Sequence, residues 1–161
     1  MSTENLTTYL NHHLGGSQAA LQMLQKLTQN EPAGDAGFFA GLHAEVESDQ
    51  QVLREIIGRL GVPESGLAKI AGGMAEFAEW AKSGLLTGKR ASLGPLESIE
   101  ILVLGITGKL LLWKSLDLIR SEIPALHRYD FAELQRRAET QRDAVEVRRL
   151  ALARQVLGSE D

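Results

Sequence analysis

Among the 21 acidic residues and four histidines of this 161-residue sequence, five are candidate metal ligands: His13, Glu45, Asp49, Glu100 and Glu146. Carboxylate and imidazole groups are the usual protein ligands of iron and related metals. Glu45 and Asp49 are four residues apart, which puts them one turn apart on one face of a helix, inside its apolar stripe. Either they lie at the edge of that stripe and reach water, or they are buried and need partners.

Polar residues on other expected helices would supply those partners. His13 and Ser17 lie one turn apart, and folding an antiparallel hairpin brings both toward Asp49. A buried histidine is more often a core residue than a ligand. Arg142 and Arg149 fall on the apolar face of the last expected helix, where Arg149 comes within about a turn of Glu100. The predicted buried polar network comprises His13, Ser17, Glu45, Asp49, Glu100, Arg142 and Arg149.

Helices must position these side chains, because apolar residues recur at three- and four-residue steps and no run alternates as a strand does. Asp35 and Asp130 are expected N-caps, with Glu133 completing a capping box after Asp130. Gly61 and Pro63 are expected to end the second helix. The expected helices cover about residues 3–30, 36–60, 64–86, 95–122 and 130–157.

Two long antiparallel pairs joined by a long crossover predict an all-α, up-down four-helix bundle, with the helix over 64–86 in the crossover. We expect one domain over residues 1–161, a normal size for a single core. The helix over 95–122 is apolar nearly all round, so it must be covered twice. Either a second copy of the chain covers it in a homodimer, or the inserted helix does so with Met74, Phe77 and Trp80.

This pattern of helix lengths, long crossover and inward polar residues resembles the ferritin-like superfamily. Its di-iron members take a Glu from each of two helices and a Glu-x-x-His from each of the other two. The sequence departs from that ligand pattern, because Glu45 is followed three positions later by Ser48 and Glu146 by Arg149. The first helix also has no acidic residue between Glu4 and Glu31. Arg149 stands where the pattern puts a ligand histidine, so a salt-bridge network is expected in place of iron.

Composition narrows the remaining classes of function. The net charge is −4 and no segment is strongly basic, which makes nucleic acid a poor partner. The sequence has no cysteine, so disulfides and thiolate metal sites are excluded. The first ten residues do not resemble a secretory signal, and the apolar stretch 99–113 is interrupted by Glu100 and Lys109, so we expect no membrane span and a cytoplasmic location.

The expected function is that of a metal-free, self-associating scaffold or interaction protein without a cofactor or catalytic residues, which makes the protein more a binding module than an enzyme. The alternative is a metal-dependent (iron) oxidoreductase or iron-handling protein with a non-standard site built from His13, Glu45, Asp49, Glu100 and Glu146. A third possibility is a small-ligand carrier that uses a cavity between the helices. Metal content separates the first two, and thermal stabilisation by an apolar ligand would indicate the third.

Overall fold

The computed structural model describes residues 3–30, 33–61 and 93–158, and these form four long helices without a strand. They are α1 (Thr3–Asn30), α2 (Ala33–Arg59), α4 (Gly94–Leu118) and α5 (Phe131–Leu157). The all-α prediction is therefore confirmed for the described part of the chain. The expected helix over 64–86, with Met74, Phe77 and Trp80, lies outside the described residues.

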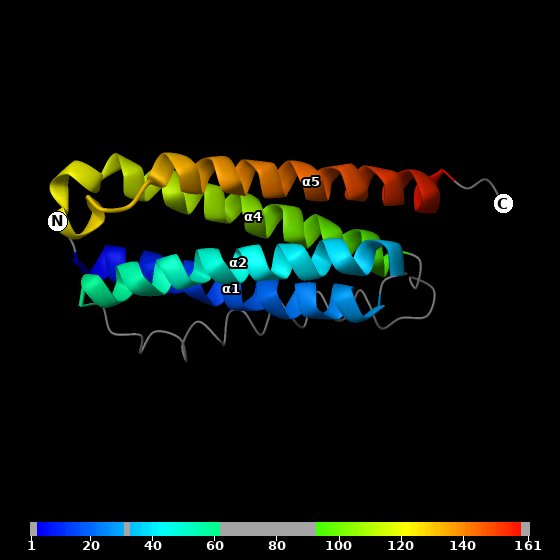
Figure 1. Ribbon diagram of the computed structural model, residues 1–161, viewed down its shortest axis with the longest axis horizontal. Coiled ribbons are helices and arrows are strands. Elements are labelled where there is room, and N and C mark those ends of the chain that lie inside the picture. Colours follow the sequence, from blue (N-terminus) through cyan, green and yellow to red (C-terminus); the bar gives the residue numbers. More distant parts are fainter. Residues whose placement is uncertain (1–2, 31–32, 62–92, 159–161) are drawn as a thin grey trace.

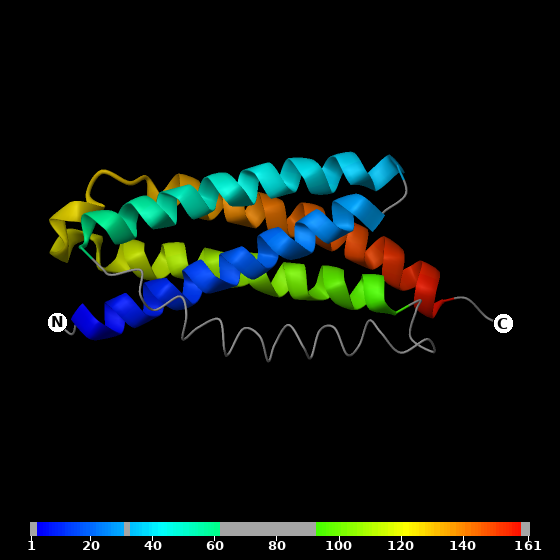
Figure 2. The ribbon, with the colours of Figure 1, turned by 90° about the horizontal axis from the view of Figure 1, so that it is seen from below.

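The four helices form two antiparallel hairpins that pack against each other (Figures 1 and 2). One hairpin is α1 with α2 and the other is α4 with α5. Figure 1 shows that α2 and α4 run in the same direction, so Gly61 and Leu93 lie at opposite ends of the bundle. The middles of all four helices therefore lie near the middle of one bundle, where side chains from distant parts of the sequence meet.

Two helix ends differ from the sequence prediction. α2 begins at Ala33, so Asp35 lies inside its first turn, where a carboxylate interacts favourably with the positive end of the helix dipole. α4 ends at Leu118 and not at Glu122. Two short 3-10 helices, η2 (Arg120–Glu122) and η3 (Pro124–Leu126), follow it. Ile123 lies between the two 3-10 helices and is extended, at φ −124° and ψ 101°, because the Pro124 ring disfavours a helical conformation in the residue before it.

Two other ends follow the prediction. Gly61 has a φ of +63°, a left-handed conformation that favours glycine and closes the C-terminal turn of α2. The Asp130 carboxylate caps α5 by accepting the Glu133 backbone N–H at 3.0 Å. The capping box is only half formed, since the Glu133 carboxylate accepts from the Arg136 guanidinium at 2.6 Å.

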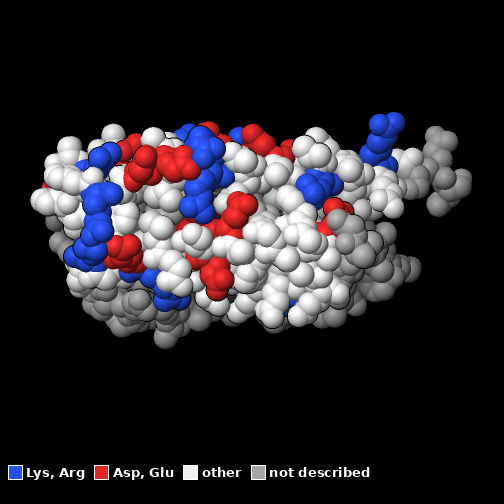
Figure 3. Space-filling model, in the orientation of Figure 1, with Lys and Arg blue, Asp and Glu red and all other residues white. Residues whose placement is uncertain are grey.

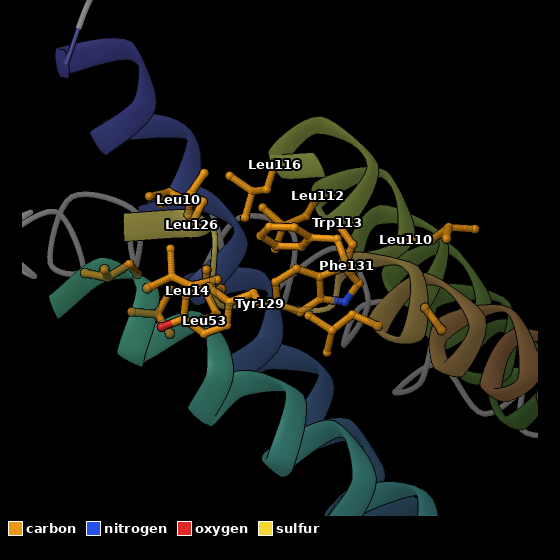
Figure 4. Close-up of a cluster of buried hydrophobic side chains, with 14 of the residues drawn as sticks. Leu10, Leu14, Leu53, Leu110, Leu112, Trp113, Leu116, Leu126, Tyr129 and Phe131 are labelled. Atoms are coloured by element: carbon orange, nitrogen blue, oxygen red, sulfur yellow. The ribbon is translucent and has the colours of Figure 1, made fainter. Parts of the chain in front are cut away.

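Apolar side chains from all four helices fill the interior in two clusters, one toward each end of the bundle. The larger cluster, drawn in Figure 4, packs Trp113 and Phe131 with leucines of α1, α2 and α4. The second cluster joins Leu24 of α1, Phe39 of α2 and Ile106 of α4 with Val145 of α5. The buried side chains that carry a charge or an amide near the middle of the bundle, Asp49, Gln50 and Gln141, lie between the two clusters, whereas Asn11 and Ser98 are buried beside one cluster each.

Candidate functional site

Each long helix has a polar residue on its inward face at the level between the two apolar clusters. On every helix, residues three or four positions before and after this polar residue belong to different clusters. The spacing follows from the helical repeat, because one turn separates consecutive residues on the inward face. The residues of this central polar layer are Ser17, Asp49, Lys109 and Gln141.

Asp49 of α2 is the most completely buried charged residue of the layer, with 2% of its surface exposed. Its Oδ2 lies 2.6 Å from the Lys109 ammonium of α4 and accepts from the Gln141 amide of α5 at 3.2 Å. Its Oδ1 lies 3.0 Å from the Arg137 guanidinium of α5. Both carboxylate oxygens therefore lie beside protein cations, although only Oδ2 accepts hydrogen bonds among the described residues, and Oδ1 has a charge contact alone.

Lys109 joins this carboxylate to the last helix. Its ammonium also donates to the Gln141 Oε1, and the Gln141 amide donates in turn to the Glu45 carboxylate at 2.9 Å. Burial lowers the pKa of the Lys109 ammonium, an effect that the neighbouring Asp49 carboxylate opposes. Glu45 itself lies on the exposed side of the layer. The contacts thus run without interruption from α2 through α4 to α5.

Ser17 of α1 contacts Gln50 of α2, and not Asp49 as the sequence predicts. Ser17 donates to the Leu14 carbonyl at 2.7 Å and accepts from the Gln50 amide at 2.8 Å. Gln50, the neighbour of Asp49, is the partner of Ser17 because Asp49 is turned toward α4 and α5. His13 packs edge-on against Tyr9, with ring centroids 4.7 Å apart. Burial, and secondarily the nearby His12, lowers the pKa of His13.

Arg142, Arg149 and Glu100, which the sequence places in the buried network, form ion pairs outside it and are half-buried or exposed. Arg142 pairs with the adjacent Asp143 at 2.9 Å. Arg149 pairs with Glu146 at 2.6 Å and with Glu100 at 3.4 Å, and the Glu100 side chain is 48% exposed. The expected contact between Glu100 and Arg149 is thus present, but its expected position inside the bundle is wrong.

Arg142 and Arg149 do not point into the bundle because of the rotation of α5 about its own axis. Gln141 occupies the inward position on this helix, and the next residue, Arg142, is turned by about 100° from it. Arg149 is two turns further along than Arg142, so it follows the same outward side. The inward charge on α5 is Arg137, one turn before Gln141.

The described residues contain no group of three or more His, Asp or Glu side chains arranged to hold a metal ion. Glu45 and Asp49 receive hydrogen bonds and positive charge from α4 and α5, whereas Glu100 and Glu146 pair with Arg149 at the surface. The five candidate ligands, His13, Glu45, Asp49, Glu100 and Glu146, are therefore divided among separate environments.

The sequence prediction did not include Lys109, Arg137 or Gln141 in the network. Lys109 is detectable from its spacing, because it lies between Ile106 and Trp113 on the inward stripe of α4. Gln141 is detectable in the same way, since it follows the buried Ala138 and precedes the buried Val145. Arg137 precedes Ala138 and gives no comparable signal, because its side chain reaches Asp49 from the edge of the stripe.

The surface carries charges of both signs. In the view of Figure 3, Lys and Arg side chains lie beside Asp and Glu side chains and do not form a continuous patch of one sign. Within the described ranges, none of the helices combines the length and apolarity that crossing a membrane requires. Comparison with protein-family models, with curated proteins and with solved structures finds no match to this chain.

Proposed function

We propose that this protein is a helical scaffold that self-associates through the outer side of α4 and works without a metal. The observation that carries the proposal is a row of three exposed leucines. Leu104, Leu111 and Leu118 are exposed by 68%, 55% and 82%. They are seven residues apart, which is two helical turns, so they lie along one side of α4.

Contact with a second copy of the chain would remove these three apolar side chains from water, which is favourable. Large apolar side chains at a seven-residue spacing are typical of helices that pair along their length, since each leucine then meets the same side of a partner helix. Two copies that pair in this way meet through identical surfaces, as a two-fold dimer requires. Ile101 lies one turn before Leu104, is half-buried, and extends the apolar surface toward the start of α4.

The charges of the central polar layer are the argument for a scaffold that works without a metal. A divalent ion beside Asp49 would stand close to the Lys109 ammonium and the Arg137 guanidinium, and like charges at such distances repel. The parallel course of α2 and α4 agrees with the ferritin-like wiring of a four-helix bundle, in which a long crossover joins two hairpins. On this proposal, Lys109 replaces the metal of a ferritin-like centre.

Sedimentation equilibrium of the wild type and of two Leu→Lys variants tests self-association. We expect the wild type to be a dimer and Leu111→Lys to be a monomer, because a lysine in the row would place two ammonium groups at the two-fold contact. Leu150→Lys is the matched control, since Leu150 lies on α5 and is 54% exposed, almost the same as Leu111. It should remain a dimer.

The proposed surface would be wrong if the wild type sedimented as a monomer, or if Leu150→Lys dissociated the dimer and Leu111→Lys did not. Circular dichroism of each variant verifies that the helices are intact, so a change in mass reports on association alone.

A further inference from the structure

A hollow of about 230 Å³ lies between α1 and α4, next to the central polar layer. Three glycines help to form it: Gly16 on α1, and Gly105 and Gly108 on α4. Among the described residues, a Cβ atom added to any of the three would meet no atom within 4 Å. The hollow therefore forms where glycines, which have no side chain, lie at the same level on α1 and α4.

The walls of the hollow are mainly apolar. Ile106, Leu112 and Trp113 of α4 line it together with Val46 and Leu53 of α2. An aromatic and aliphatic lining of this kind stabilises a ligand by removing its apolar surface from water. The volume exceeds the ~150 Å³ of a cavity that holds benzene, and so fits a ligand of roughly ten non-hydrogen atoms.

All ionisable groups among the described residues that line the hollow are basic: His12, His13 and Lys109. Lys109 donates to Asp49 and to Gln141, so two of the three N–H donors of its ammonium group have acceptors among the described residues, and the third is the one that a ligand would use. No carboxylate belongs to this part of the lining, which distinguishes the hollow from the mixed charges of the outer surface. An anionic group is therefore the polar group that fits best beside these residues.

We propose that the hollow binds a small apolar carboxylic acid, with its hydrocarbon part against the α4 wall and its carboxylate beside Lys109 and the two histidines. The apolar walls provide affinity for the hydrocarbon part. The basic residues select the acid over a neutral or a cationic molecule of the same length. This site is lined by different residues from those of the proposed self-association surface, and the two adjoin each other at Gly108, which lies one turn after Leu104 and one turn before Leu111.

Isothermal titration of the full chain at neutral pH with three eight-carbon probes tests the selection. The probes are octanoate, octan-1-ol and octylammonium. We expect octanoate to bind about tenfold more tightly than octan-1-ol, because a hydrogen bond to a charged group contributes about that much. Octylammonium should bind more weakly still, because it brings a second ammonium group close to that of Lys109.

Substitution of a lining glycine tests the position of the site. Gly105→Phe places a ring in the open space, and we expect it to weaken octanoate binding about tenfold or more. Gly41→Phe is the matched control, because Gly41 lies on the exposed side of α2, also has nothing within 4 Å, and is not part of the lining. Gly108→Leu is a second filling variant in case Gly105→Phe does not fold, as judged by thermal melting.

Three results would each overturn the proposal. These are no binding of octanoate to the wild type, equal binding of the three probes, and binding of octanoate to the folded filling variants as tight as its binding to the wild type and to Gly41→Phe.

Discussion

Asp49 organises the interior of the bundle because it is a buried carboxylate with two cationic neighbours. Replacing it by alanine leaves the Lys109 ammonium buried without its counter-charge and takes an acceptor from Gln141. Breaking a buried ion pair from one side costs about 3–5 kcal/mol, because the remaining charge stays desolvated. We therefore expect Asp49→Ala to lower the free energy of unfolding by that amount in a urea titration.

Glu55→Ala provides the comparison for that measurement. Glu55 pairs with Arg59 at 2.9 Å on the surface of the same helix, with both side chains more than 40% exposed. A surface pair contributes at most about 1 kcal/mol. If the two alanine variants lost equal stability, Asp49 would not have the central role described above.

His13 gives the molecule a predictable response to pH. Its pKa in the folded state lies below the ordinary value of 6.5 because the ring is buried. As the pH falls through 6.5 toward that lower value, the unfolded chain takes up a proton before the folded chain does, so this residue lowers the free energy of unfolding. Above 6.5 the ring is neutral in both states, and its contribution does not change with pH.

We expect His13→Gln to lose less stability than the wild type between about pH 7.5 and about pH 5.5. Urea titrations at the two pH values measure this difference. His127→Gln is the control, because His127 is exposed after η3. A His13→Gln variant with the full wild-type loss would show that His13 titrates alike in both states.

The candidate site was predictable at some positions and not at others, for a geometric reason. Asp49 was predicted because it interrupts an apolar stripe on a single helix, which the sequence reveals directly. The partner of Ser17 was predicted one residue away from its true position at Gln50, since helix spacing fixes depth to about a turn but not rotation. The inward placement of Arg142 and Arg149 failed for the same reason, because rotation of α5 turns Arg137 inward in their place.

At the scale of the helices, local signals predicted ends well only where one residue fixes the backbone. Gly61 and the Asp130 cap are such cases. The end of α4 was misplaced by four residues, because the helical pattern continues to Glu122 while Pro124 allows a tighter turn to form before it. The start of α2 was misplaced because an aspartate is favourable both at an N-cap and in the first turn.

The cap of α5 should make a measurable contribution to stability. Removing an N-cap aspartate leaves a backbone N–H of the first turn without its acceptor and costs about 1 kcal/mol. We expect Asp130→Ala to lower the free energy of unfolding by about that amount in urea. Glu139→Ala, at an exposed mid-helix position of α5, should change it by less than about 0.5 kcal/mol. Equal effects of the two substitutions would contradict the capping role.

At the scale of the whole molecule, the central polar layer connects the two hairpins. Asp49 on one hairpin meets Lys109, Arg137 and Gln141 on the other, between two largely apolar clusters. A sliding movement of one hairpin along the other by one turn would bury each of these charges against apolar residues. The layer therefore fixes how the hairpins align, and its carboxylates are neutralised by the protein itself.

The iron content of the chain after anaerobic incubation with excess ferrous iron and gel filtration tests this neutralisation most directly. Because Lys109 and Arg137 occupy the surroundings of Asp49, we predict an iron content close to background and well below one per chain. A content of about two per chain, as a di-iron bundle of this kind would hold, would contradict the account.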